Sequence, residues 1–580
     1  MSASTTVRAL RKAVPGDHPP GVRTLLELDL SRGLAESPPT DPLRALRQRQ
    51  VPQLSNVVTG LRLAADDDGV AGLIVCLGPH DLTVAQSEEL GRAVQAFRSA
   101  GKTAVCWTEA FGELGPGTVP YYLASHFDEI WMQPSGRLGL VGVAASAVFV
   151  RGALDKLGVQ PQIGQRHEYK SAADMFLRED MSPAQREMLQ RISDSVVQQV
   201  VQTVAAGRGL TESAVLDAVQ VGPLSGPDAV ARGLVDRLGY RDEAYDALRA
   251  RLASGDEEPR LLYVDRYARS RTRRPGAQLQ RRRKPTVAIV SVHGPINRGR
   301  SGSARPLSGP TVGSDTVCAA LRAARHDDHV KAVVLRVDSP GGSYVASDAI
   351  RREVVRTRES GRPLVASMAS VAASGGYFVS MAADAIVALP GTITGSIGVL
   401  GGKQVVHDAL ARIGVNRESV AAGRRAAMFS TDRPFDDEEW QVVEAWLDEV
   451  YADFTTKAAR DRSMAYEELE RHARGRVWTG ADAHGLGLVD EMGGLDRAVE
   501  IACARAGLAR NKVNARPYPQ VPLLQRIRPA ESSAAASASP TTTMWDGAPT
   551  GSSDLLVTLG QLLGVASGGP LMLPGRWRMG

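Results

Sequence analysis

Short apolar runs rich in β-branched residues alternate along this chain with longer segments of helical periodicity. Residues 286–292 (TVAIVSV) and 332–338 (AVVLRVD) have the composition of buried strands, and a helical pattern over residues 347–358 follows a Gly-Gly turn. Strands that alternate with helices predict βαβ units and a mostly parallel sheet. We therefore expect an α/β fold, with two long amphipathic helices at residues 183–206 and 436–460 that protrude from the sheet cores.

The same succession of sequence blocks occurs twice. DGV at residues 68–70 recurs as DHV at residues 328–330, which is 260 positions later. Three further pairs follow in the same order: YYLASHFDEIWMQP from Tyr121 with YFVSMAADAIVALP from Tyr377, LDKLGV from Leu154 with LARIGV from Leu410, and SGPDAVARGLVD from Ser225 with TGADAHGLGLVD from Thr479. Ordered recurrence of this kind predicts two tandem copies of one structural unit.

The repeats predict five parts of the chain. These are an N-terminal extension (1–59), a first repeat (60–253), a basic linker (254–285), a second repeat (286–515) and a low-complexity C-terminal tail (516–580). The arginine- and proline-rich linker is typical of a solvated connection, and a contact with anionic lipid is the second interpretation. Residues 516–553 have the composition of a disordered segment. The apolar stretch at 555–573 is broken by glycine and proline, so we expect it to dock on the protein, with weak membrane adsorption as the alternative.

Composition narrows the class of protein. The formal charge is +5 over 580 residues and aromatic residues are 5%, which argues against a nucleic-acid-binding protein. The four cysteines form no CxxC pair, so we expect neither a disulfide framework nor a structural zinc site, and the pattern favours a reducing compartment. We find no signal-peptide h-region and no apolar run near 18 residues. These features predict a cytoplasmic protein, with peripheral membrane association as the alternative.

Three motifs of the second repeat carry candidate chemistry. DSPGGS at residues 338–343 predicts a turn at the end of a parallel strand, where the N–H groups near Gly341 and Gly342 can bind an oxyanion. In SVAASGGYF, Ser374 precedes Gly375 at a strand-to-helix turn, the arrangement that exposes a nucleophilic hydroxyl. In GTITGSIGV, Ser396 can hydrogen-bond an amine. Taken singly, the three motifs are also typical of an ordinary tight turn, a helix N-cap serine and a glycine-rich turn.

A nucleophilic serine needs a general base, and the second repeat offers no clear one. Neither His293 nor His407 has a spacing or an acidic partner that suggests a catalytic triad. A lysine can act as the base if burial lowers its pKa from about 10.4 toward neutrality. The second-repeat segment NRESVAAGRRAAMF contains arginines, which stay charged and cannot take this role.

The first repeat supplies the missing group. Its corresponding segment reads QRHEYKSAADMF and contains Lys170, whereas Thr118 and Leu140 align with Ser374 and Ser396. One repeat has therefore kept the lysine and the other the serine. This complementarity predicts a composite site that combines Lys170 with Ser374, although an isolated lysine is usually a surface residue.

These segments resemble the long, double-domain form of the signal peptide peptidase A family. The resemblance covers roughly residues 60–500 and includes EYKSAADMFLREDMSPAQRE in the first repeat and VLRVDSPGGS, SVAASGGYFVSMAADAI, GTITGSIGV and GRVWTGADAHGLGLVD in the second. It implies that Lys170 is the base, Ser374 the nucleophile and Ser396 the serine that supports the lysine. It also implies two spiral βα domains of the Clp protease/crotonase type, assembled as a ring-like oligomer.

The sequence thus predicts a serine endopeptidase with a Ser/Lys dyad that degrades cleaved signal peptides and other unfolded, apolar peptides. It is expected to need no metal and no cofactor, to bind peptides rather than nucleic acid, and to form a homo-oligomer, with a tetramer as one option. Two alternatives stay open. A crotonase-type acyl-CoA enzyme would use the same oxyanion chemistry with a carboxylate base, and a non-catalytic scaffold would only bind peptides or membranes.

Overall fold

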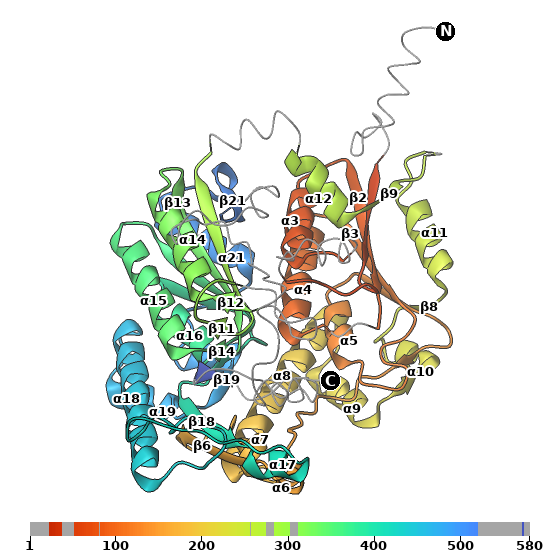
Figure 1. Ribbon diagram of the computed structural model, residues 1–580. Helices are drawn as coiled ribbons and strands as arrows, with labels where there is room; N and C mark the ends of the chain where they lie inside the picture. Colours follow the sequence, from red (N-terminus) through yellow and green to blue (C-terminus); the bar gives the residue numbers. More distant parts are fainter. Residues whose placement is uncertain are drawn as a thin grey trace, which may run out of the picture. The chain divides into compact units, whose positions relative to one another are not determined.

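The computed structural model describes residues 23–36, 51–79, 82–255, 257–273, 284–301, 311–519 and 571–572. These residues fall into two compact units, each built on its own parallel sheet (Figure 1). The first unit contains the described residues up to Ala144 and those of 196–284, and the second contains residues 145–195 and the described residues from Pro285 onward. A segment of the first sequence repeat therefore belongs to the second unit.

The first unit has a six-stranded sheet with strand order β8-β4-β3-β2-β1-β9, and all its pairings are parallel. Every residue of β2 is buried, as expected for a strand that is covered on both faces. The strands are β1 (Thr24–Asp29), β2 (Val70–Leu77), β3 (Thr103–Thr108), β4 (Glu129–Met132), β8 (Arg237–Leu238) and β9 (Arg260–Tyr263). The short strands β5 (Arg137–Leu138) and β7 (Leu224–Ser225) form a separate antiparallel pair.

Helices cover both faces of this first sheet. Leu73 and Val75 point to one face and pack in a large apolar cluster, whereas Ile74 points to the other and packs with α11 (Arg241–Arg251), because side chains alternate along a strand. The helices whose residues share the large cluster are α3 (Leu54–Ala65), α4 (Val84–Ser99), α5 (Thr118–Ala124), the C-terminal part of α8 (Pro183–Arg208), α9 (Glu212–Val221), α10 (Gly226–Ala231) and α12 (Val264–Arg273).

The second unit has a sheet with strand order β19-β17-β15-β13-β10-β21, in which β16 also pairs with β15 and β20 pairs with β16. All of these pairings are parallel except β17 with β19. The strands are β10 (Thr286–His293), β13 (Val330–Ser339), β15 (Leu364–Ala373), β16 (Ala385–Ala388), β17 (Ile393–Gly395), β19 (Val477–Thr479), β20 (Glu491–Met492) and β21 (Asn514–Pro517). The α/β class with mainly parallel sheets is therefore confirmed.

Both faces of the second sheet are also covered. Val333 and Leu335 of β13 pack in the main cluster, and Val334 packs on the opposite face with α21 (Leu495–Arg505). The main cluster includes residues of α14 (Ser314–His326), α15 (Tyr344–Glu359), α16 (Gly375–Ser380), α18 (Asp437–Asp461), α19 (Tyr466–His472) and α20 (Gly480–Gly485). The order β1-α3-β2-α4-β3-α5-β4 of the first unit recurs here as β10-α14-β13-α15-β15-α16-β16, with short strands inserted.

Two smaller sheets complete the second unit. β6 (Gln160–Arg166) pairs antiparallel with β18 (Val399–Val405), which ties the segment 145–195 to the second repeat. The other sheet has the order β12-β11-β14-β22, with β11 (Ile296–Asn297), β12 (Val312–Gly313), β14 (Gly341–Gly342) and β22 (Leu571–Met572). The remaining helical elements are α6 (Arg151–Leu157), α7 (Asp174–Leu177), α17 (His407–Arg412), the 3-10 turn η1 (Arg510–Lys512) and α8 (Pro183–Arg208), whose residues are divided between the units.

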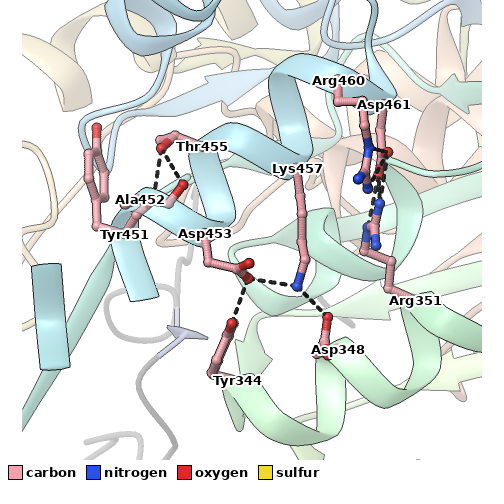
Figure 2. Close-up of polar contacts among 10 residues, drawn as sticks. All are labelled: Tyr344, Asp348, Arg351, Tyr451, Ala452, Asp453, Thr455, Lys457, Arg460 and Asp461. Carbon is pink, nitrogen blue, oxygen red and sulfur yellow. Dashed lines mark hydrogen bonds and ion pairs between the residues drawn. The ribbon is translucent and has the colours of Figure 1, made fainter. Parts of the chain in front are cut away.

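Helix α18 is fastened to α15 by a polar network (Figure 2). Arg351 of α15 makes a bidentate ion pair with Asp461, and both side chains are buried. Lys457 Nζ lies 2.7 Å from a carboxylate oxygen of Asp348 on α15 and 2.7 Å from one of Asp453 on α18. These contacts hold α18 against α15. Elsewhere on α18, Glu444 and Asp448 pair with Arg166 at the end of β6.

Two segments that were predicted to lie outside the repeats contribute elements to the first unit. The N-terminal extension contributes β1, which lies between β2 and β9 in the first sheet and whose run TLLELD is buried almost throughout. The predicted linker contributes β9 and α12, because Val264 and Tyr267 between its arginines are buried in the first unit. Most of the predicted disordered stretch 516–553 lies outside the described residues. Of the apolar stretch 555–573, the structure describes Leu571 and Met572, which are docked in β22.

In the part of the chain that the structure describes, no helix combines the length and the apolar composition that crossing a membrane requires.

Candidate active site

Ser374 lies at a strand-to-helix turn in the second unit, as its motif predicted. It follows β15 directly and precedes α16, with a φ of 56° and a ψ of −114°. A positive φ is uncommon for a residue with a Cβ and marks a conformation that the surrounding structure must hold in place. Here the Ser374 N–H donates to the Gly395 carbonyl (2.8 Å), and the Ser374 carbonyl accepts from Phe378 N–H (2.9 Å). The side chain is completely buried.

The glycines after Ser374 allow the close packing that this turn needs. A Cβ on Gly375 would lie 2.8 Å from Ser347 Oγ and 3.1 Å from Gly341 Cα, and a Cβ on Gly376 would lie 2.6 Å from the Ser339 carbonyl oxygen. The Ser339 carbonyl is backbone and has little freedom to move, so glycine is required at position 376, whereas at position 375 the Ser347 hydroxyl would have to shift. This explains in structural terms why the serine is followed by two glycines.

Lys170 is the group that faces Ser374. It lies on the turn between β6 and α7, within the segment of the first repeat that belongs to the second unit. Its Nζ is 2.8 Å from Ser374 Oγ, 2.9 Å from Ser396 Oγ and 3.1 Å from the Ser396 carbonyl oxygen. The lysine side chain has no exposed surface, and this burial lowers the pKa of Lys170 well below its ordinary value because the ammonium form loses its hydration.

Ser396 completes a cluster of three buried polar side chains. It follows β17 directly, with a φ of 51°, and its N–H donates to the Arg476 carbonyl (2.7 Å). The structure thus brings together the three side chains that the sequence singled out. A buried amine that lies within hydrogen-bond distance of a serine hydroxyl has the geometry of a nucleophile and its general base.

The three candidate oxyanion glycines also lie side by side. Gly341 and Gly342 form β14 with positive φ angles of 102° and 151°, and the Gly342 nitrogen is 3.1 Å from the point that a Cβ of Gly375 would occupy. The Gly341 N–H donates to Ser339 Oγ (3.1 Å). Backbone N–H groups that converge beside a nucleophile are suited to bind developing negative charge.

The two histidines considered from the sequence occupy other positions. His293 Nδ1 lies 3.1 Å from an Asp338 carboxylate oxygen, and His407 is exposed at the start of α17. Within the described residues, the side-chain group bonded to Ser374 Oγ is the amine of Lys170.

Two residues near Lys170 were missed by the sequence reasoning. Gly475, with a φ of 82°, packs so closely that a Cβ there would lie 2.5 Å from the Lys170 nitrogen and 2.6 Å from its Cα. Arg166, at the end of β6, pairs with Glu444 (2.8 Å) and Asp448 (2.5 Å) of α18. Gly475 begins the GRVWTG motif, but no sequence pattern shows which backbone a glycine faces.

Comparisons with known proteins show which family this chain resembles. The profile described as "Peptidase family S49" matches residues 96–254 and 356–509. The chain is 33% identical over 486 residues to "Serine protease SPPA, chloroplastic" of Arabidopsis thaliana, covering 83% of this chain and 68% of that protein. It is also 33% identical over 507 residues to "Protease 4" of Salmonella typhi, covering 84% and 79% of the two chains. Among solved structures, a ClpP1 mutant from Listeria monocytogenes matches at 15% identity with a TM-score of 0.24, over 36% of this chain and 92% of that chain.

Proposed function

The chain belongs to peptidase family S49 and is a serine protease of the signal peptide peptidase type, and on this premise we propose that Ser374 is its nucleophile and Lys170 its general base. The observation that carries the proposal is the 2.8 Å separation of Lys170 Nζ and Ser374 Oγ in a fully buried site. Burial lowers the pKa of Lys170 well below its ordinary value and so favours the neutral amine, which has the lone pair that a base needs.

In the first step, Ser374 Oγ attacks the scissile carbonyl carbon while its proton moves to Lys170 Nζ. The carbonyl oxygen becomes an oxyanion, and the backbone N–H groups of Gly342 and Gly375 stabilise it, because the Gly341 N–H already donates to Ser339 Oγ. Gly375 is the stronger candidate of the two because it follows the nucleophile directly. Ser396 holds the lysine amine in line through its Oγ and its carbonyl oxygen.

In the second step, the ammonium of Lys170 returns its proton to the leaving amine, the C–N bond breaks and an acyl-enzyme forms on Ser374. A water molecule then attacks the acyl carbonyl and gives its proton to Lys170. The ester bond breaks, Ser374 Oγ recovers a proton and the peptide acid leaves. Every proton in this cycle passes through Lys170 Nζ, and no metal or cofactor takes part.

We further propose that the substrates are cleaved signal peptides and other unfolded, apolar peptides. The likeness to signal peptide peptidase A supports this substrate class. All four cysteines are buried and none forms a disulfide in the described part of the chain, which supports a reducing compartment such as the cytoplasm, with peripheral membrane contact as the alternative. We also propose a homo-oligomer, with a tetramer as one option, and multi-angle light scattering that gives a monomer mass would contradict it.

The test of the function is labelling by a serine-directed fluorophosphonate together with hydrolysis of fluorogenic apolar peptides. We expect both, with the label on Ser374. Saturable binding of acyl-CoA without labelling would instead indicate the crotonase-type alternative, and peptide binding without hydrolysis would indicate the scaffold. The comparisons favour neither alternative, because the Arabidopsis thaliana and Salmonella typhi relatives are both named as proteases.

Gly475→Ala is expected to lower kcat by about 10- to 100-fold without removing any reacting group. The added Cβ would lie within 2.6 Å of the Lys170 backbone, so the lysine must shift, and a displacement near 1 Å costs a rate factor of that size. Gly485→Ala is the matched control, because a Cβ at Gly485 meets nothing within 4 Å. Steady-state hydrolysis of one peptide measures both variants, and a wild-type rate for Gly475→Ala would contradict the assigned position of Lys170.

A further inference from the structure

Leu571 and Met572, near the C-terminus of the sequence, lie beside the candidate active site. Leu571 and Met572 form β22, which pairs antiparallel with β14, with Met572 opposite Gly341 and Leu571 opposite Gly342. Leu571 is fully buried and belongs to the main apolar cluster of the second unit, and Met572 is 6% exposed. This two-residue segment is therefore docked by both its backbone and its side chains.

The strand that β22 pairs with carries two of the three candidate oxyanion glycines. A Cβ on Gly341 would collide with the Leu571 carbonyl oxygen and would lie 2.7 Å from the Gly375 nitrogen. The Leu571 carbonyl and the Gly375 N–H thus lie on the same side of Gly341 Cα. Because Gly375 follows Ser374, the docked segment lies where a substrate carbonyl must come to react.

The strand order shows that β22 takes the edge of β14 that is available for pairing. In the sheet β12-β11-β14-β22, one edge of β14 is paired with β11 and the other with β22. An extended peptide binds to a strand edge by adding a strand, with its backbone giving affinity and its alternate side chains giving specificity. A peptide substrate that pairs with β14 must therefore use the edge that β22 fills.

We propose that Leu571–Met572 is a resident competitor: it occupies the peptide-binding edge of Gly341–Gly342, and an extended apolar substrate binds by displacing it. This inference rests on the proposed function and identifies both the regulation of the site and the side chains that the site takes. The two side chains at this edge are apolar and buried, so the site selects apolar residues at these positions. Among the described residues the paired contact comprises Leu571 and Met572, and a contact of this length is short enough to exchange with a substrate.

The first test is the full-length double variant Leu571→Asp/Met572→Asp. Two buried carboxylates cannot stay at this edge, so the segment is expected to leave it. In the wild type, a tethered competitor raises the apparent KM by a factor that grows with the ratio of its local concentration to its dissociation constant. When the double variant loses this competitor, we expect its KM for an apolar peptide to be about 3- to 10-fold lower than that of the wild type, with kcat unchanged. Val420→Asp, which changes an exposed apolar residue, is the matched control. A wild-type KM in the double variant would overturn the inference.

The second test adds the segment back. The peptide ASGGPLMLPGRW, residues 566–577, carries a fluorophore, and its binding is measured by polarisation. We expect it to bind the double variant more tightly than the wild type and to inhibit the variant competitively, whereas the peptide with both aspartates does neither. Equal binding of both peptides, or equal binding to both proteins, would overturn the inference.

The third measurement separates a competitor from a substrate. Intact mass spectrometry of the wild type and of Ser374→Ala is expected to give the full chain in both. Loss of residues beyond the docked segment that depends on Ser374 would show that the segment is cleaved, which overturns its role as a resident competitor. If the wild type neither hydrolyses peptides nor takes the serine label, the proposed function fails, and the polarisation experiment still decides whether the segment occupies this edge.

Discussion

Ser374→Ala is expected to abolish peptide hydrolysis, with a fall in kcat of about ten-thousand-fold or more. Removing the nucleophile of a covalent mechanism leaves only the contribution of the oxyanion site and of substrate binding. The alanine keeps the backbone of the turn, which is held by the bonds to Gly395 and Phe378 rather than by the hydroxyl. We therefore expect the variant to be folded, to bind apolar peptides and to take no fluorophosphonate.

The measurement is hydrolysis of one fluorogenic peptide by equal concentrations of each protein, with circular dichroism as the test of folding. Ser360→Ala is the matched control, since its hydroxyl bonds to the Thr357 carbonyl at the end of α15, away from the three-residue cluster. Hydrolysis by Ser374→Ala within tenfold of the wild-type rate would remove Ser374 as the nucleophile.

Lys170→Met removes the base and is expected to lower kcat by about a thousand-fold or more at every pH. In the wild type, kcat/KM is expected to fall as the pH falls through the pKa of Lys170, because the protonated amine cannot accept the serine proton. Since burial places that pKa well below its ordinary value of 10.5, the activity should reach its plateau well below pH 10.5. Lys170→Arg is expected to be inactive too, because the guanidinium stays protonated.

The same variant makes a prediction for stability, with a definite sign. The pKa of Lys170 is lower in the folded than in the unfolded chain, so the unfolded chain binds more protons between the two values. The free energy of unfolding of the wild type therefore rises with pH through that window and levels off above the unfolded pKa. A methionine at position 170 does not titrate, so it adds no such pH dependence. The free energy of unfolding of Lys170→Met minus that of the wild type is therefore expected to be greatest at the low-pH end of the window and to decline toward pH 10.5.

Urea unfolding of both proteins at several pH values between about 6 and 10.5 measures this difference. Lys102→Met is the matched control: its amine bonds to the carbonyls of Asp67 and Val70 at a half-buried position in the first unit. A stability difference between Lys170→Met and the wild type that does not change with pH would show that Lys170 is protonated in the folded protein across the window. The general-base assignment would then fail.

The local pattern of apolar and polar residues predicted several of the strands and helices well. The predicted strands at 286–292 and 332–338 are β10 and the centre of β13, and the predicted helices at 183–206 and 436–460 are α8 and α18 within two residues at each end. The predicted helix at 347–358 begins earlier, at Tyr344, because Ser343 caps it by accepting a bond from the Ala346 N–H. Apolar periodicity and capping act over a few residues, so a single sequence records them.

The repeat pattern does not show which segments outside the repeats join the sheets, for a physical reason. Matching the repeats finds the segments in which the two copies resemble each other. It misses strands that join a sheet through pairing alone, such as β1 from the N-terminal extension and β9 from the basic segment. Strand pairing is a contact between distant parts of the chain, and neither strand carries its partner in its own pattern.

The sequence alone determined the residue types of the candidate site: a serine before two glycines, a lysine kept in one repeat and lost from the other, and a second serine in a glycine-rich turn. Only the tertiary structure decided that Lys170 and Ser374, 204 positions apart, stand 2.8 Å from each other with Ser396 beside them. It also decided that Gly475 packs on the lysine and that Leu571 and Met572 close the edge of β14. Residue types are fixed locally by the chain, whereas burial, close approach and a lowered lysine pKa arise only when distant segments pack together and exclude water.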